Sequence, residues 1–166
     1  MEDSFSQQIN VASEQLASRL LQHNKMLAVA ESCTGGWLAK ELTDLPGSSR
    51  WFIGGVVSYT NRTKQQLLKV DGRCLQQFGA VSEEVAQQMA AGALTVFDSS
   101  ISVSITGVAG PAGGTEAKPV GMVCFAVASG LNSVDSWTKI FKGRRLEIRQ
   151  QAVLTALQLL INLLPE

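Results

Sequence analysis

The sequence predicts an α/β protein in which three layers, helix, sheet and helix, are built around a mixed five-stranded sheet. Segments with the helical spacing of apolar residues alternate with short apolar or β-branched runs along the whole chain. The first apolar run ends in a glycine-containing turn that leads into a helix, as in other α/β folds. The last two runs are close enough to form a hairpin, which makes the sheet mixed rather than parallel.

The first half of the chain is predicted to contain three helices and two strands. Apolar residues recur every three or four positions over 6–21, which indicates an amphipathic helix. The apolar run 26–32 is predicted to be a strand, and helical spacing returns over 37–45. Residues 52–59 are rich in β-branched and aromatic side chains, which favours a second strand, and a short helix follows over 61–70.

The second half is predicted to contain two long helices and three strands. Ser82 lies at a cap position before two acidic residues, which is typical of a helix start. Residues 107–121 hold five glycines and two prolines and are therefore predicted to be a loop. The elements are a helix over 84–97, strands over 101–107, 121–130 and 136–143, and a closing helix over 144–164.

Composition restricts the class of function. A chain of 166 residues that is 45% apolar and 17% charged predicts one globular domain over residues 1–166. Its 14 basic residues balance its 14 acidic ones, which argues against nucleic acid as a partner.

The longest apolar runs are shorter than the roughly 18 residues of a membrane span, and the amino terminus does not resemble a signal peptide. We therefore expect a soluble, cytoplasmic protein without a membrane partner. Its three widely spaced cysteines favour neither disulfides nor a metal site.

The first candidate site follows the first predicted strand. Ser32, Cys33 and Thr34 precede two glycines and a helix start. Ser32 is the candidate nucleophile. The N–H groups of the helix's first turn, unpaired within the helix, are expected to stabilise an oxyanion beside it, as are the amides around Cys33 and Thr34 or those of the 107–110 loop. Two alternatives remain. Ser32 or Thr34 only caps the helix, or Cys33 is the nucleophile, if a helix amino terminus favours its thiolate.

A serine nucleophile needs a base, and Lys64 is the economical candidate. His23, the only histidine, lies far in sequence from any glycine-rich loop. Lysine accepts a proton only when neutral, so its pKa near 10.4 has to fall by about three units, at a cost of about 4 kcal/mol. Tyr59, the only tyrosine, is positioned to hydrogen-bond Lys64 or Ser32 and relay protons. The alternative for Lys64 is a solvated helix residue.

The loop after the third strand is a further candidate site. Successive amides from Thr106 to Gly114 are typical of an anion-binding nest, although the segment lacks the ending of a P-loop. Lys118, Arg145 and Arg149 add positive charge near loops or a helix start. The alternative is that these glycines only turn a surface loop. The residues by themselves therefore indicate an enzyme that acts on an anionic small molecule.

Several uncommon strings, in one order, resemble those of a known family. They are AESCTGG at 30–36, PGSS at 46–49, SYTNRTK at 58–64, GAVS at 79–82, SITGVAGPAGG at 104–114 and KPVG at 118–121. From about Val11 to Leu163 the chain is similar to the CinA carboxy-terminal domain family, whose characterised stand-alone members are nicotinamide mononucleotide deamidases.

The resemblance implies an amidohydrolase that converts nicotinamide mononucleotide and water into nicotinate mononucleotide and ammonia, with no metal or other cofactor. It implies Ser32 as nucleophile, Lys64 as base, Tyr59 at the family's tyrosine position, a small-molecule nucleotide as partner, a homodimer, and the same α/β/α fold with a mixed five-stranded sheet. The residues expected to bind substrate are Thr34, Gly35, Ser48, Thr106, Gly107, Ala109, Gly110 and Arg145.

Two departures from the family pattern lie near these residues. Arg144 stands where the family commonly has an aspartate, and Arg62-Thr63 stands where it commonly has glutamate-alanine, directly before Lys64. An added cation beside a lysine helps to lower the lysine pKa, unless it faces solvent. The family also contains paralogues of unclear substrate. The alternative function is therefore a catalytically silent module that binds a pyridine nucleotide or a partner.

Overall fold

The computed structural model describes residues 4–130 and 132–165; the remaining parts of the expected domain, residues 1–3, 131 and 166, lie outside the described residues. The helices are α1 (Ser4–Gln22), α2 (Trp37–Thr43), α3 (Asn61–Leu68), α4 (Gly72–Phe78), α5 (Glu83–Val96), α6 (Arg145–Leu163) and the short 3-10 helix η1 (Ser48–Arg50). The strands are β1 (Leu27–Glu31), β2 (Phe52–Val57), β3 (Ile101–Gly107), β4 (Met122–Gly130) and β5 (Ser133–Ile140).

The strands form one mixed sheet in the order β2-β1-β3-β4-β5, as predicted. β1 pairs in parallel with β2 and β3, whereas β4 pairs antiparallel with both β3 and β5. The carboxyl ends of β1, β2 and β3 therefore meet at one edge. β4 starts at that edge and β5 ends there, because Met122 pairs with Ile140. The segments after β1, β2, β3 and β5 converge at this edge.

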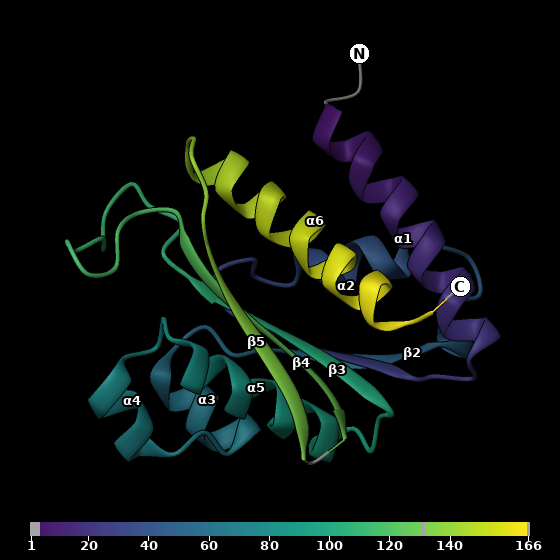
Figure 1. Cartoon of the computed structure of the whole chain (residues 1–166), viewed down its shortest axis with the longest axis horizontal. Helices are drawn as coiled ribbons and strands as arrows, with labels where there is room; N and C mark the ends of the chain where they lie inside the picture. Colours follow the sequence, from purple (N-terminus) through teal and green to yellow (C-terminus); the bar gives the residue numbers. More distant parts are fainter. Residues whose placement is uncertain (1–3, 131, 166) are drawn as a thin grey trace.

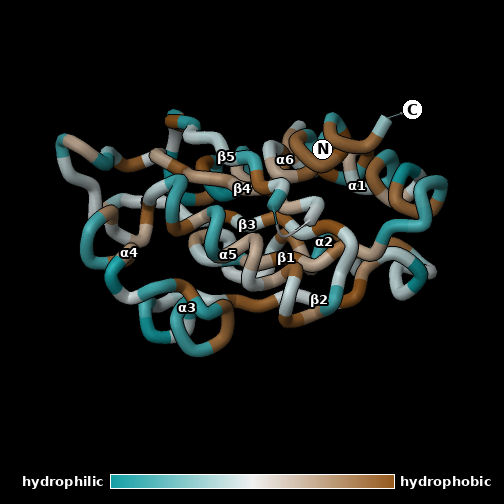
Figure 2. Tube along the Cα trace, turned by 60° about the horizontal axis from the view of Figure 1, so that its bottom comes forward, coloured by the Kyte–Doolittle hydropathy of each residue, from teal (hydrophilic) through white to brown (hydrophobic). Residues whose placement is uncertain are grey.

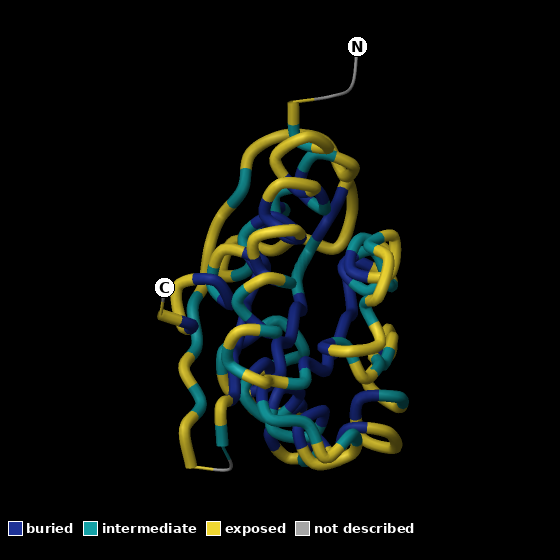
Figure 3. The backbone as a smooth tube through the Cα atoms, turned by 90° about the vertical axis from the view of Figure 1, so that its right-hand side faces the viewer, coloured by how far each residue is buried: buried dark blue, intermediate teal, exposed yellow. Residues whose placement is uncertain are grey.

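Helices cover both faces of the sheet, which confirms the three-layer prediction. Figure 1 shows α1, α2 and α6 on one side of the strands and α3, α4 and α5 on the other. Figure 2 shows hydrophilic, teal residues on α3 and α4 at the periphery, and Figure 3 shows the buried stretches in the middle of the molecule. Among the described helices, none is long and apolar enough to cross a membrane.

The two faces of the sheet carry side chains of different size. The face under α1, α2 and α6 carries large apolar residues: Leu27, Val29, Ile101, Val103, Ile105, Val123, Phe125 and Val127. The face under α5 carries small ones: Ala28, Ala30, Ser102, Ser104, Cys124, Ala126 and Ala128. Small residues let α5 lie close to the sheet, so the buried hydroxyls of Ser102 and Ser104 each donate to an α5 carbonyl at 2.6 Å.

The structure differs from the sequence-based assignment most clearly in three places. β2 ends at Val57 rather than residue 59, because the backbone leaves the ladder before Thr60 caps α3. β5 covers Ser133–Ile140 rather than 136–143, since the hairpin is tighter than expected. Residues 72–78 form a helix that the sequence analysis left unassigned; it is short, but Asp71 caps its start and Gly79 ends it with a positive φ.

Candidate functional site

The turn after β1 is fixed by the buried carboxylate of Glu31. This carboxylate accepts hydrogen bonds from the amides of Gly36, Leu38 and Ala39, at 2.8 to 3.1 Å. Glu31 therefore caps the amino terminus of α2 from the preceding strand. The expectation that the first-turn amides of this helix are free for an oxyanion is wrong, because a side chain already occupies them.

Two amides before the helix remain available beside Ser32. Among the hydrogen bonds that join different described residues, none is donated by the amide of Cys33 or of Thr34; the Cys33 amide interacts with its own thiol. Their carbonyls are held from the other side by Arg149, whose guanidinium donates to Cys33 O at 3.1 Å and to Thr34 O at 2.8 Å. The same guanidinium lies 5.1 Å from the ring centroid of Trp37, a cation–π contact. Arg149 thus holds in place the turn that contains the N–H groups of Cys33 and Thr34.

Ser32 and Lys64 meet directly. Lys64 comes from the first turn of α3 and Ser32 follows β1, and Lys64 Nζ lies 2.9 Å from Ser32 Oγ. Lys64 Nζ also donates to the carbonyl of Ser58 at 2.7 Å. The lysine is 1% exposed, so it is not the solvated helix residue of the alternative reading. Sequence reasoning missed Ser58, because nothing in a pattern of residue types indicates where a carbonyl will point.

Burial makes the amine of Lys64 easier to deprotonate. Desolvation lowers the pKa of Lys64 from its ordinary 10.5 to about 8. No acidic side chain bonds to Lys64 among the described residues to offset this shift. A neutral amine within hydrogen-bond reach of an alcohol is the arrangement that general-base activation of serine requires.

Cys33, the rival nucleophile, has the opposite character. Its thiol is buried, and desolvation raises the pKa of Cys33 to about 12. A thiol in this state is almost entirely protonated near neutral pH and is a poor nucleophile. The environment that lowers the pKa of Lys64 therefore works against Cys33.

Tyr59 and Arg145 lie together at the outer rim. Arg145, at the start of α6, donates from Nη2 to the Tyr59 hydroxyl at 3.1 Å and from Nη1 to the carbonyl of Gly110 at 2.8 Å. Tyr59 is 57% exposed, and in the described chain its hydroxyl bonds to neither Ser32 nor Lys64. The expected direct bond from Tyr59 to the serine or lysine is therefore absent, because β2 ends early and the ring turns outward.

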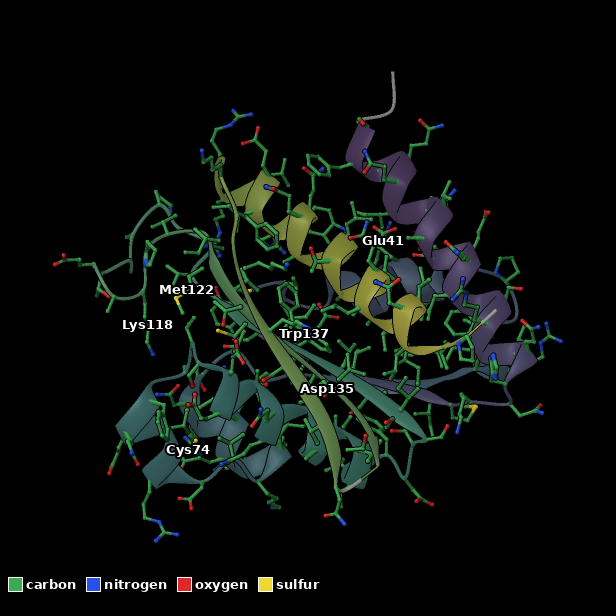
Figure 4. The ribbon with its side chains drawn as sticks, in the orientation of Figure 1. Glu41, Cys74, Lys118, Met122, Asp135 and Trp137 are labelled. Atoms are coloured by element: carbon green, nitrogen blue, oxygen red, sulfur yellow. The ribbon has the colours of Figure 1, made fainter. Side chains whose placement is uncertain are left out.

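A pocket of about 280 Å³ joins these groups. Its lining consists of Ser32, Cys33, Tyr59, Lys64, Ala80, Val81, Thr106, Gly107, Val108, Ala109, Gly110, Ala112, Gly113 and Arg145. The glycine-rich loop forms one wall, and Figure 4 shows Lys118 extending from this loop toward the layer that contains α4. There the amine of Lys118 donates to the carbonyl of Phe78.

Most of the residues expected to bind substrate line this pocket, but three do not. Thr34 and Gly35 follow the lining residue Cys33 without being part of the lining, and the Thr34 side chain is buried. Ser48 lies in η1, directly before β2. Because β2 runs parallel to β1, the segment before β2 is at the amino edge of the sheet, opposite Ser32. This chain's own pocket therefore does not include Ser48, and its role in binding stays a prediction.

Other lining residues have roles that the sequence did not indicate. Thr106 lines the pocket, but its hydroxyl donates to the carbonyl of Ala80 at 2.9 Å, so it ties two walls together. Ala80 and Val81 enter the lining from the segment between α4 and α5. Ala80 and Val81 have apolar side chains without a reactive group, so sequence reasoning had no basis for selecting them.

Comparison with protein families gives one match over most of the chain. The model described as the CinA C-terminal domain matches residues 9–164. A protein of Shigella flexneri named nicotinamide-nucleotide amidohydrolase PncC is 47% identical over 148 residues, which cover 89% of this chain and 90% of that protein. A CinA-like protein of Mycobacterium marinum is 50% identical over 153 residues, 92% of this chain and 36% of that protein. The chain thus spans about a third of the length of such mycobacterial relatives.

Solved structures show the same fold. The competence/damage inducible protein CihA of Agrobacterium tumefaciens superposes with a TM-score of 0.90 at 39% identity, covering 94% of this chain and 95% of that one. A CinA superfamily protein of Escherichia coli superposes with a TM-score of 0.91 at 34% identity, covering 99% and 94%. The sheet and its covering helices are therefore shared with these proteins.

Proposed function

Because this chain belongs to the CinA C-terminal domain family, we propose that it is a nicotinamide-nucleotide amidohydrolase. The reaction would convert nicotinamide mononucleotide and water into nicotinate mononucleotide and ammonia. The observation that carries the proposal is the 2.9 Å contact between Lys64 Nζ and Ser32 Oγ in a pocket, with the pKa of the lysine lowered to about 8. A serine paired with a neutral amine is suited to attack on a carboxamide.

Acylation would begin with transfer of the Ser32 proton to neutral Lys64. Oγ attacks the carboxamide carbon, and the carbonyl oxygen becomes an oxyanion facing the amides of Cys33 and Thr34. Protonated Lys64 then gives its proton to the amide nitrogen as the C–N bond breaks, so ammonia leaves and an ester to Ser32 remains. The carbonyl of Ser58 keeps the amine of Lys64 in line during both transfers.

Deacylation would reuse the same groups with water in place of serine. Lys64, neutral again after ammonia leaves, takes a proton from water, and the hydroxide attacks the ester carbon. The tetrahedral intermediate collapses when Ser32 Oγ leaves and recovers the proton from Lys64. Nicotinate mononucleotide is released, and the dyad returns to its starting state with no net proton change on the protein.

Ammonia release from a panel of amides tests the proposal. The panel is nicotinamide mononucleotide, nicotinamide riboside, free nicotinamide and glutamine, each followed by coupled ammonia detection and by chromatography of the acid formed. We expect equal amounts of ammonia and nicotinate mononucleotide from the first compound, and turnover of glutamine at background. Tight binding of nicotinamide mononucleotide without ammonia would reject the proposal in favour of a silent nucleotide-binding module.

The proposed base predicts how activity depends on pH. The folded-state pKa of Lys64 lies near 8, so the active, neutral amine increases as pH rises toward that value. We expect kcat/KM to rise about tenfold per pH unit well below 8 and to level off above it. The nicotinamide ring of the substrate is cationic, and a nearby cation disfavours the protonated lysine, so the midpoint for kcat should lie lower than that for kcat/KM.

Initial rates with nicotinamide mononucleotide between pH 6 and pH 9.5 measure both midpoints. A buffer series of constant ionic strength separates the titration from screening effects. A profile that is flat across this range, or that falls between pH 6 and pH 8, would contradict a neutral lysine base.

Replacing Cys33 separates the two candidate nucleophiles. With its pKa at about 12, the thiol is ionised in fewer than about one molecule in 10⁴ at pH 7.5. We therefore expect Cys33→Ala to keep ammonia release within about fivefold of the unmodified chain, the loss coming only from packing. Loss of activity comparable to that of a serine substitution, in a variant with unchanged circular dichroism, would make Cys33 the nucleophile instead.

A further inference from the structure

A half-buried arginine of α6 binds the backbone of the turn after β1 and has no acidic partner. The guanidinium of Arg149 donates to Cys33 O at 3.1 Å and to Thr34 O at 2.8 Å. Among the described residues, no acidic side chain forms an ion pair with Arg149, whereas Arg144 at the start of the same helix pairs with Glu147 at 3.2 Å. The positive charge of Arg149 is therefore not neutralised, and it acts directly on two carbonyls of the turn.

Both carbonyls are connected through peptide groups to the N–H groups beside Ser32. The carbonyl of Cys33 and the N–H of Thr34 belong to one peptide group, so a cation at the oxygen strengthens the N–H as a donor. The carbonyl of Thr34 shares a peptide group with the N–H of Gly35, which donates to the carbonyl of Ser32 at 3.0 Å. The carbonyl of Ser32 in turn shares its peptide group with the N–H of Cys33.

Two chains of peptide groups therefore begin at one guanidinium and end at the two N–H groups that face the oxyanion in the proposed mechanism. Each hydrogen bond in such a chain polarises the next, and the effect is larger when the first donor is charged. The carboxylate of Glu31 does not take part in either chain, because the first amide that it binds in this turn is that of Gly36.

We propose that Arg149 is a positioning residue for the oxyanion, which orients the N–H groups of Cys33 and Thr34 and strengthens them as donors through the peptide groups of the turn. The inference rests on the proposed function, since the oxyanion forms only when Ser32 attacks a carbonyl. An oxyanion gains more from a strengthened donor than a neutral carboxamide does, so Arg149 stabilises the transition state more than the bound substrate. An arginine that only joined α6 to the turn would affect both states alike.

The first measurement is of kcat and KM for nicotinamide mononucleotide at pH 9, where Lys64, with a pKa of about 8, is mostly neutral. We expect Arg149→Met to lower kcat by about 30-fold and to change KM by less than about threefold, because the donors are weakened but not removed. Arg149→Lys keeps the charge but not the fork that spans two carbonyls, so kcat should fall by about fivefold. The lysine variant decides the question if the methionine variant does not fold.

The second measurement uses the aldehyde analogue of nicotinamide mononucleotide, in which the carboxamide is replaced by a formyl group. Oγ of Ser32 forms a bond to the aldehyde carbon, the C=O π electrons move to the oxygen, and the serine proton passes to Lys64. We expect Arg149→Met to bind this compound about 30-fold more weakly than the unmodified chain does. In Ser32→Ala, where no addition occurs, the added Arg149→Met change should alter the affinity for nicotinamide mononucleotide by less than about threefold.

Arg144→Met is the control for net charge. It removes one positive charge at the start of the same helix, but Arg144 contacts Glu147 rather than the turn and lies outside the pocket lining. Its kcat and its affinity for the aldehyde should equal those of the unmodified chain. Three outcomes would overturn the inference: unchanged kcat in Arg149→Met, an equal loss in Arg144→Met, or a loss of amide affinity in the Ser32→Ala background as large as the loss of aldehyde affinity.

If the unmodified chain releases no ammonia from nicotinamide mononucleotide, the proposed function fails, and labelling of Ser32 by a fluorophosphonate decides the inference alone. Oγ forms a bond to phosphorus as the P–F bond breaks, fluoride leaves, and the serine proton passes to Lys64, while the phosphoryl oxygen takes the place of the oxyanion. Mass spectrometry should show labelling of Arg149→Met about 30-fold slower than labelling of the unmodified chain or of Arg144→Met. Equal rates, or no labelling of the unmodified chain, would reject the role of Arg149.

Discussion

Ser32→Ala is expected to lower kcat for ammonia release from nicotinamide mononucleotide by at least about 10⁴-fold, while the protein stays folded. Oγ is the atom 2.9 Å from Lys64 Nζ, and alanine leaves no atom that can form the ester. The amides beside position 32 and the rest of the pocket remain, so residual activity and nucleotide binding should both be measurable. The assay is ammonia release at pH 8, with rapid-quench mass spectrometry to detect the acyl-enzyme in the unmodified chain only.

Ser58→Ala is the matched control for this prediction. Ser58 is also fully buried, and its hydroxyl has no hydrogen-bonding partner among the described residues, while its carbonyl, which contacts Lys64, is kept in the variant. We expect its activity to stay within about fivefold of the unmodified chain. If Ser32→Ala retains more than a tenth of the activity, the ester mechanism is rejected, and a water activated directly by Lys64 becomes the simpler account.

Lys64→Met should lower kcat/KM by at least about 10³-fold without a comparable loss of stability. Methionine has a similar length and fills the same buried space, but it accepts no proton from Ser32. Burial of the ammonium costs the folded state free energy, and methionine removes this cost while leaving the carbonyl of Ser58 unpaired. These effects oppose each other, so the free energy of unfolding at pH 7.5 should change little.

The pH dependence of unfolding gives an independent readout for Lys64. Its pKa is about 8 when folded and near 10.5 when unfolded, so between these values the unfolded chain binds more protons and stability rises with pH. Between pH 7.5 and pH 9.5 the unmodified chain should gain about 2 kcal/mol relative to Lys64→Met, measured by urea unfolding. An equal pH dependence in both proteins would mean that the amine of Lys64 is not desolvated in the folded state.

The local patterns of the sequence were sufficient for the five strands and for every described α-helix except α4, but not for all the ends of these elements. Apolar runs predicted β1, β3 and β4, because these central strands lie between two helical layers and are buried on both faces. α4 was missed because a helix of seven residues has too few turns to show a periodic pattern. Its N-cap residue, Asp71, is also a residue type that is common in loops. β2 was predicted two residues too long because the strand-like residue composition continues through Ser58 and Tyr59, although the pairing of β2 with β1 ends at Val57.

The candidate site was predictable from the sequence where a reactive residue type also follows the carboxyl end of a predicted strand. Ser32 follows a strand and precedes a helix, so its place at the carboxyl edge followed from the order of elements. Lys64 was suggested because the only histidine is remote, and the family resemblance pointed to the same residue. The family resemblance also pointed to Ser48, but it did not indicate that Ser48 lies before β2, away from the pocket that contains Ser32.

By itself, the sequence determined the layer order, the mixed sheet and the edge where a ligand would bind, because these depend on hydrophobic spacing and on short connections, which are local properties. Only the tertiary structure decided the state of the groups at that edge. It buried Lys64 against Ser32, used Glu31 to occupy the helix amides, and turned Tyr59 outward to Arg145. The pKa of an amine and the direction of a hydroxyl depend on desolvation and on partners that are distant in sequence, so no local pattern encodes them.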